Sequence, residues 1–429
     1  MTKPELLAPA GSLDMLKTAF AFGATAVYAG QPRYSLRVRN NDFGDLDVLK
    51  QGIDHAHSLG HRFYLVSNIF PHGNKIKHYV QNMTPVIELK PDAMIMSDPG
   101  LIMMVRETWP DMEIHLSVQA NTVNAAAVRF WNMAGVKRII LSRELSLDQV
   151  EQIRQDCPDA ELEVFVHGAL CIAYSGRCLL SGYMSHRDAN QGACTNACRW
   201  DYKVKPGAED AAGQVFLLEE AQQPGEFMPI EEDEHGTYVM NSKDLRAIEH
   251  VHRLVAIGVN SLKIEGRTKS PYYVARTVQA YRQAIDDASS GKPLDPALIG
   301  QLEGLANRGY TSGFYQRHTP AETQNYLKGH SESGRSQYSG DVVAFDTQRG
   351  LAQVSVKNRF AVGDRLELIQ PTGNFDFDIT HMENTAGEAV QVAPGSGHTV
   401  WLPLPAQSVG AFVARYVQPE LIDDHQPAH

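Results

Sequence analysis

The chain lacks the features that would place it in a membrane or outside the cell. It has no run of about 18 apolar residues, so we expect no membrane-spanning helix and no membrane partner. Its first residues, Met1 to Pro9, lack the apolar core of a signal peptide. Only five of its 429 residues are cysteine, and in a reducing compartment these are thiols, metal ligands or redox groups rather than structural disulfides. We therefore expect a cytoplasmic protein.

Several catalytic motifs are also missing. There is no His-Glu-x-x-His zinc helix, because His250-x-His252 has the wrong spacing, and there is no Gly-x-Ser-x-Gly elbow of a serine hydrolase. No Gly-x-Gly-x-x-Gly turn follows the first predicted strand, although an open doubly wound sheet stays possible. These absences give little support to a peptidase or a dinucleotide-binding enzyme.

Basic residues are absent from one acidic segment. Between Gly207 and His235 there are nine Asp and Glu and no Lys or Arg, so the rest of the chain carries only about −2 of the net charge of −11. Charge therefore neither favours nor excludes an RNA partner.

Short apolar runs alternate with amphipathic segments up to about residue 290. The runs are continuous, as expected of parallel strands that are buried on both faces. Eight such units in a row predict a (β/α)8 TIM-like barrel. The predicted strands are Glu5–Pro9, Ala26–Gly30, Arg62–Asn68, Ala93–Ser97, Glu113–Ser117, Arg138–Ser142, Glu161–Val166 and Ser261–Gly266.

The pattern changes after the barrel. Residues 1–306 are predicted to form the barrel, with a cysteine-rich loop and the acidic insertion at about 171–236, and residues 307–340 form a linker. Residues 341–421 contain alternating strands separated by turns and predict a small C-terminal antiparallel β-barrel domain.

Polar side chains lie where the barrel strands end, which is the active face of such barrels. For any single one of them, a loop that simply begins there is the more ordinary explanation, whereas the rim as a whole favours a site. The candidate substrate-binding residues on this rim are Arg37, Arg39, Asn68, Gln119, Arg143, His167, Arg177, Glu265 and Arg267, while no catalytic residue can be named.

Four of the five cysteines gather within 28 residues after the seventh strand: Cys171, Cys178, Cys194 and Cys198. Four thiolates bind either zinc or an iron–sulfur cluster. Their spacing, with 6, 15 and 3 residues between successive cysteines, contains no Cys-x2-Cys pair of the kind structural zinc prefers. The spacing favours an iron–sulfur cluster and leaves zinc open.

The segment Glu163-x-Phe165-x-x-Gly168-Ala169-Leu170-Cys171-x4-Gly176-x-Cys178-x-Leu180-Ser181 resembles the signature of the peptidase U32, or collagenase-like, family. Further segments, such as His115-Leu-Ser-Val-Gln-Ala-Asn and Leu262-Lys-Ile-Glu-Gly-Arg, extend the resemblance over nearly the whole chain, to a subgroup that acts in tRNA hydroxylation. The resemblance implies a barrel followed by a C-terminal β-barrel.

The same resemblance implies a [4Fe–4S] cluster on Cys171, Cys178, Cys194 and Cys198, with Cys198 the least secure ligand. It also implies formation of 5-hydroxyuridine at the tRNA wobble position, linked to prephenate as co-substrate. Arg37 and Arg39 would suit the two carboxylates of prephenate, because Arg binds carboxylates bidentately. The aromatic and Arg residues around the cysteines, from Tyr174 to Tyr202, would suit a single-stranded anticodon loop.

Three kinds of function stay open at this point: an RNA hydroxylase, a U32-type hydrolase with Cys171 and His167, and a zinc-loaded binding protein. A hydroxylation factor for another RNA or a small aromatic substrate is a variant of the first. The electron donor, the oxygen source and the oligomeric state are not readable from the sequence.

Overall fold

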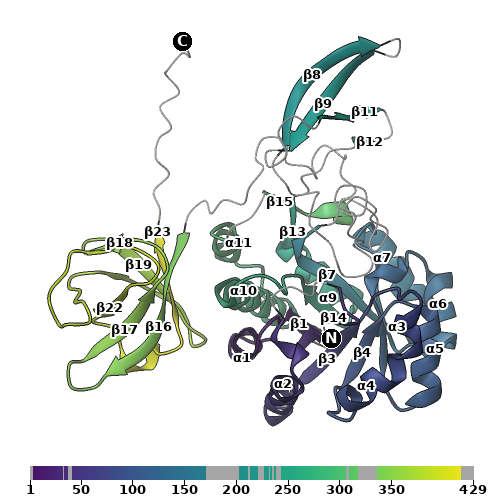
Figure 1. Ribbon diagram of the computed structural model, residues 1–429, viewed down its shortest axis with the longest axis horizontal. Helices are drawn as coiled ribbons and strands as arrows, with labels where there is room; N and C mark the ends of the chain where they lie inside the picture. Colours follow the sequence, from purple (N-terminus) through teal and green to yellow (C-terminus); the bar gives the residue numbers. More distant parts are fainter. Residues whose placement is uncertain are drawn as a thin grey trace. The chain divides into compact units, whose positions relative to one another are not determined.

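A computed structural model gives the structure of the chain (Figure 1). It describes residues 3–31, 33–36, 41–170, 243–305, 309–316 and 337–416, together with the backbone of strands between 202 and 237 and of residue 336. The chain divides into two compact units: residues 1–296 with 307–331, and residues 297–306 with 332–429.

The first unit contains a closed barrel of eight parallel strands. Neighbouring strands follow each other in sequence, and β14 closes the ring by pairing with both β1 and β7. The predicted TIM-like barrel is confirmed. Its strands are β1 (Glu5–Pro9), β2 (Ala26–Gly30), β3 (Arg62–Ser67), β4 (Ala93–Met96), β5 (Ile114–Leu116), β6 (Arg138–Ile140), β7 (Glu161–Ala169) and β14 (Ser261–Ile264).

Helices follow the strands and lie around the outside of the barrel (Figure 1). Local sequence sets their ends. Ser146 and Gln149 form a capping box at the start of α7, and Gly258 ends α9 in the left-handed conformation. The described helices of this unit are α1 (Leu13–Ala21), α2 (Leu46–Ser58), α3 (Asn74–Lys77), α4 (Tyr79–Ile87), α5 (Pro99–Thr108), α6 (Ala125–Met133), α7 (Leu147–Asp156), α9 (Val251–Ile257) and α10 (Pro271–Ser289).

The amphipathic pattern of Asp244–Ile257 predicts one helix before the eighth barrel strand, and this prediction is partly wrong. The segment is a helix only in its second half, and its first three residues form strand β13 (Asp244–Arg246). β13 pairs antiparallel with the end of β7 and parallel with β15 (Tyr310–Thr311). A three-residue strand carries too little periodicity to be distinguished from the first turn of a helix.

Between β7 and β13 the described backbone forms two antiparallel sheets. One orders β10-β9-β8, and the other pairs β11 with β12. The bounds are β8 (Tyr202–Asp210), β9 (Gly213–Glu220), β10 (Phe227–Ile230), β11 (Glu232–Asp233) and β12 (Gly236–Thr237).

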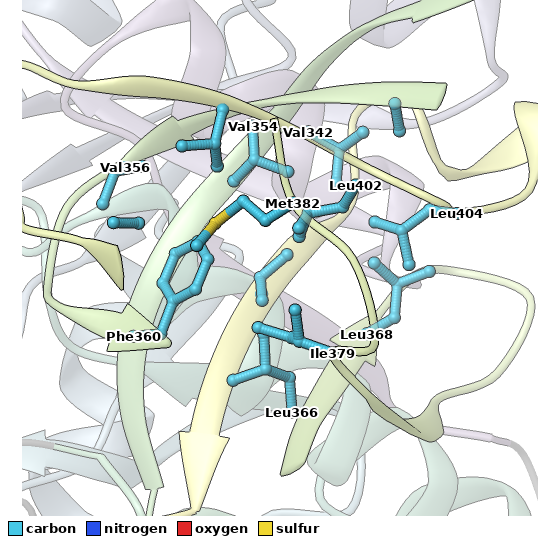
Figure 2. Packing of buried hydrophobic residues seen from close by; sticks show 14 of the residues in the cluster. Val342, Val354, Val356, Phe360, Leu366, Leu368, Ile379, Met382, Leu402 and Leu404 are labelled. Carbon is cyan, nitrogen blue, oxygen red and sulfur yellow. The ribbon is translucent and has the colours of Figure 1, made fainter. Parts of the chain in front are cut away.

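The second unit contains helix α11 (Ala297–Glu303) and an antiparallel sheet domain with one hydrophobic core (Figure 2). Six strands run in the order β20-β19-β23-β16-β17-β22, and β18 pairs with β21. The predicted antiparallel domain is confirmed. The strands are β16 (Ser336–Asp346), β17 (Leu351–Val356), β18 (Phe360–Ala361), β19 (Arg365–Ile369), β20 (Phe375–Asp378), β21 (Val392–Ala393), β22 (Thr399–Leu402) and β23 (Phe412–Tyr416).

Candidate functional site at the barrel mouth

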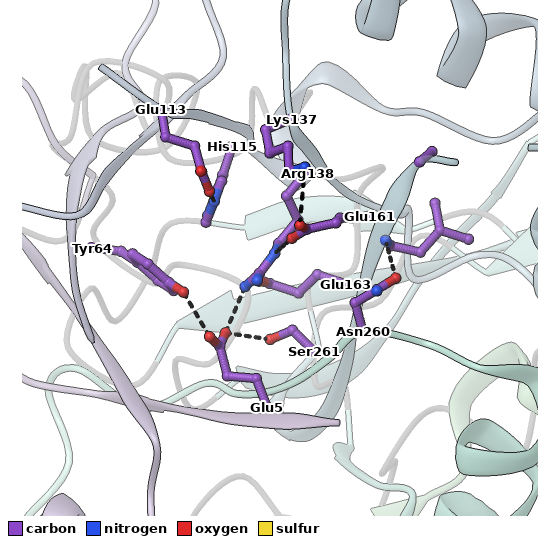
Figure 3. A network of polar contacts seen from close by, with 12 residues as sticks. Glu5, Tyr64, Glu113, His115, Lys137, Arg138, Glu161, Glu163, Asn260 and Ser261 are labelled. Carbon is purple, nitrogen blue, oxygen red and sulfur yellow. Dashed lines mark hydrogen bonds and ion pairs between the residues drawn. The ribbon is translucent and has the colours of Figure 1, made fainter. Parts of the chain in front are cut away.

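The barrel interior is polar near the amino ends of its strands (Figure 3). Glu5 accepts hydrogen bonds from the Tyr64 hydroxyl at 2.6 Å, from Ser261 at 3.0 Å and from Arg138 at 2.5 Å. Arg138 also reaches Glu161 at 3.0 Å. These contacts join five strands at the end of the barrel opposite the usual active face, where a role in stability is expected.

Lys263 extends this network toward the centre of the barrel. Its Nζ donates to Glu163 Oε1 at 2.8 Å, and Glu163 also lies 3.4 Å from Arg138. Burial opposes the charge on Glu163, but Lys263 and Arg138 outweigh it and hold the pKa of this carboxyl below its ordinary value. Burial, with a smaller contribution from the positive charges of Arg267 and Arg138, lowers the pKa of the Lys263 amine, and the opposing effect of Glu163 does not offset it.

Tyr28 covers Lys263 on the side of the barrel mouth. The Lys263 ammonium lies 4.3 Å from the centre of the Tyr28 ring, and the Arg267 guanidinium lies 5.8 Å from the same centre. The Tyr28 hydroxyl donates to the Ile264 carbonyl at 2.9 Å. Two cations therefore lie against one aromatic ring on this side of the mouth.

Amide and hydroxyl groups meet where β3, β4 and β5 end. Asn68 accepts from the Leu36 N–H at 3.0 Å and donates to Ser117 Oγ at 3.4 Å. Ser97 and Ser117 donate to Gln119 Oε1 at 3.3 and 3.4 Å. Gln119 is only 3% exposed, and its Nε2 has no hydrogen-bond partner among the described residues. The structure therefore brings the two predicted residues Asn68 and Gln119 into one cluster.

The rim after β6 and β7 carries the next predicted residues. Ser142 Oγ donates to Asn121 Oδ1 at 3.0 Å and also contacts Glu144. The Arg143 guanidinium lies flat over the Phe165 ring, 3.9 Å from its centre. This stacking holds a cation at the mouth without burying it fully.

His167 is buried beside three tyrosines. Its ring lies 5.5 Å from the rings of Tyr281 and Tyr310 and 5.8 Å from that of Tyr273, and its Nδ1 is 3.4 Å from the Tyr281 hydroxyl. Burial, helped by the charges of Lys269 and Arg246, lowers the pKa of His167 to about 3. The imidazole is therefore neutral at neutral pH.

Glu265 and Arg267 follow β14 and are both 8% exposed. The Glu265 N–H donates to the His167 carbonyl at 2.9 Å, and Arg267 donates to the Leu36 carbonyl. These contacts join the end of β14 to the end of β7 and to the segment after β2.

The other predicted residues lie outside the described part of the chain: Cys171, Cys178, Cys194, Cys198, Arg37, Arg39 and Arg177. β7 ends at Ala169, and Leu170 is the last residue described before Cys171. Within the described ranges no group of three or more His, Cys, Asp or Glu could hold a metal ion. The fifth cysteine, Cys157, is a buried free thiol at the end of α7.

The prediction of site residues left out the inner charges Glu5, Arg138, Glu163 and Lys263. A signal for them exists in the sequence, because Glu163 and Lys263 lie inside barrel strands and Glu5 and Arg138 are the first residues of such strands. Such a residue must be paired in the folded protein.

Within the described residues no helix is long and apolar enough to cross a membrane.

Comparisons with known proteins match the whole arrangement. The family model "Peptidase family U32" matches residues 11–325, and "Peptidase family U32 C-terminal domain" matches residues 334–413. The chain is 59% identical to "tRNA hydroxylation protein P" of Escherichia coli and 56% identical to that of Haemophilus influenzae, over 94% of this chain and of each relative. It is 31% identical to "Collagenase" of Porphyromonas gingivalis, over 86% of this chain and 87% of that protein. The chain belongs to peptidase family U32 and contains both the family's main domain and its C-terminal domain.

Proposed function

We propose that this chain is a tRNA-modifying iron–sulfur protein that takes part in the prephenate-dependent hydroxylation of the wobble uridine to 5-hydroxyuridine. The observation that carries the proposal is the 59% identity, over 94% of both chains, to a relative named tRNA hydroxylation protein P. Such identity over nearly all of both chains is typical of proteins with a common activity.

The four clustered cysteines supply the donor set that a [4Fe–4S] cluster requires. Cys171 follows directly on Leu170 after β7, and the carboxyl ends of barrel strands are where barrel enzymes hold their reactive groups. A bound cluster would carry the electrons that hydroxylation of the uridine ring transfers, a task that side chains alone cannot perform.

The rim residues would then bind and orient the substrates. Asn68, Gln119, Arg143, Glu265 and Arg267 would face them at the barrel mouth, and Arg37, Arg39 and Arg177 would add positive charge for prephenate and RNA. The Tyr28 ring, with cations at 4.3 and 5.8 Å, contributes to the electropositive mouth that an anionic substrate needs.

The test is the nucleoside content of tRNA. A host that lacks hydroxyuridine in its tRNA, because its own hydroxylation genes are deleted, should regain the nucleoside when this chain is expressed and should not regain it with Cys171→Ser. Anaerobically purified protein should be brown and contain about four irons per chain. Unchanged digests from the complemented host, with the protein present and iron-loaded, would overturn the proposal.

Peptide hydrolysis is the second candidate, since the family name and the 31% identical collagenase suggest it. It would need His167 to take the proton of the Cys171 thiol. A base with a pKa of about 3, buried beside Tyr281, is far too weak to deprotonate a thiol of ordinary pKa. Peptide cleavage by the metal-free protein that Cys171→Ser abolishes would nevertheless establish this activity.

A further inference from the structure

A polar cavity of about 380 Å³ lies beside the barrel mouth, on the short strands β13 and β15 that extend from β7 (Figure 1). Its lining includes the side chains of Lys243, Arg246 and His250 from the β13 segment, and of Thr311 and Ser312 from the β15 segment. Glu249 is the one carboxylate among its lining residues.

The groups in this cavity are predominantly hydrogen-bond donors. Arg246 lies 5.2 Å from the centre of the Tyr310 ring and 3.5 Å from Glu249, which fixes its guanidinium at the cavity wall. Lys243 lies along Gly309 and forms no ion pair with any residue that the structure describes. Lys243 and Arg246 outnumber Glu249, the one carboxylate among the lining residues, and this balance favours an anionic ligand.

The cavity is close to the end of β7. Arg246 is directly opposite His167 in the β13–β7 register, and the Tyr310 ring that borders the cavity lies 5.5 Å from the His167 ring. One side chain thus separates the cavity from the barrel strand that leads to Cys171.

We propose that this cavity binds a backbone phosphate of the RNA substrate and so fixes the register of the RNA at the barrel mouth. Arg, Lys, Ser and Thr are the side chains that most often contact nucleic-acid phosphates. The volume accommodates a phosphate with part of its sugar, and most of the lining residues are polar or charged. The inference rests on the proposed function, because it takes tRNA as the partner.

The experiment measures binding of an anticodon stem-loop to the full-length, iron-loaded protein as a function of salt. Loss of one phosphate contact in Lys243→Gln should weaken binding about 3- to 10-fold at low salt and should reduce the slope of log K against log salt by about 0.7 to 0.9. Glu249→Gln should strengthen binding, because it removes the negative charge from the cavity. Lys137→Gln is the matched control, since this exposed lysine precedes β6 at the other end of the barrel and should change neither quantity.

The outcomes separate the two proposals. If the wild-type protein binds the stem-loop and Lys243→Gln binds it with the same affinity and the same salt slope, the phosphate site is overturned and the proposed function is unaffected. A second outcome concerns inorganic phosphate. If the wild-type protein binds it saturably, Lys243→Gln loses this binding, and RNA binding of the variant is unchanged, then the cavity binds free phosphate and the RNA assignment is overturned. If Lys243→Gln lowers the salt slope of RNA binding but the wild-type chain restores no hydroxyuridine in the host, the phosphate site is supported and the proposed function is overturned.

Discussion

At the scale of single residues, the buried pair Lys263–Glu163 tests how the barrel holds charge in its interior. Both side chains are at most 4% exposed, and their charged atoms are 2.8 Å apart. Glu163→Gln leaves the Lys263 ammonium buried without its carboxylate, and Lys263→Met removes one of the two cations around Glu163. We expect each variant to lose about 3 to 5 kcal/mol of unfolding free energy.

The double variant Glu163→Gln/Lys263→Met should lose less unfolding free energy than the sum of the two single variants, because no charge of this pair then stays buried without its partner. Urea unfolding followed by circular dichroism measures all three. The control is Lys137→Met, which breaks the exposed pair with Glu161 at 3.5 Å and should cost no more than about 1 kcal/mol. Equal losses for Lys263→Met and Lys137→Met would contradict the interpretation.

His167 predicts a pH dependence of stability. Its pKa is about 3 in the folded chain and close to 6.5 when unfolded, so below pH 6.5 only the unfolded state gains the proton. Stability is therefore lost as the pH falls from 6.5 toward 3. At pH 7 the His167→Gln variant should have a lower unfolding free energy than wild type, because the ring contacts are lost. At pH 5 this difference in unfolding free energy should be smaller by about 2 kcal/mol, because only the wild type loses stability through His167.

Urea midpoints at pH 7 and pH 5 measure the effect. A gap for His167→Gln of equal size at both pH values would show that the imidazole gains its proton in the folded protein.

At the scale of elements, the junction of β7 and β14 depends on Gly168. Its φ is +104°, and a Cβ at this position would lie 2.5 Å from the Glu265 carbonyl oxygen. Gly168→Ala should therefore lower the unfolding free energy by about 3 kcal/mol or more, since a backbone atom would have to move. Gly60→Ala is the matched control: its φ is +70°, but nothing lies within 4 Å, so only about 1 to 2 kcal/mol of backbone strain is expected.

Thermal unfolding midpoints of the two glycine variants give the comparison. A second readout is the iron content per chain, which should fall in Gly168→Ala because β7 leads directly to Cys171. Equal midpoints for the two variants would show that the two strands can separate at little cost.

The barrel was predictable from sequence because its strands are short, continuous apolar runs with helices of regular period between them. β1 and β2 begin and end where the apolar runs Glu5–Pro9 and Ala26–Gly30 do. β13 was not predictable, because its three residues pair with β7 only through tertiary contact. The same holds for β15, which has two residues.

Site residues were predictable by position and much less by environment. The pattern placed Asn68 and Gln119 at strand ends, and the structure brings them together through Ser97 and Ser117. It gave no indication that His167 is enclosed by tyrosines, because Tyr281 and Tyr310 are more than 100 residues away in sequence. The surroundings of a side chain depend on residues that are distant in sequence, so the spacing of residues along the chain does not predict them.

At the scale of the whole molecule, each compact unit has a hydrophobic core of its own. One hydrophobic cluster of the second unit is formed by described residues between 342 and 413, including Val354, Leu366 and Leu402 (Figure 2). A domain of this size can fold independently when its core is continuous. We therefore expect the fragment 332–429 to fold without the barrel and to unfold cooperatively on heating.

The fragment also gives a direct test of that core. Leu366 is fully buried in the hydrophobic core of this domain, so Leu366→Ala should lower the stability of the fragment by about 2 to 5 kcal/mol. The exposed Val343 provides the control, because Val343→Ala removes a side chain that is 50% exposed and should have a much smaller effect. Circular dichroism and calorimetry of the three fragments measure this. If the fragment 332–429 proved unfolded while 297–429 folded, α11 would be a required part of the domain, since residues 297–306 belong to the same compact unit.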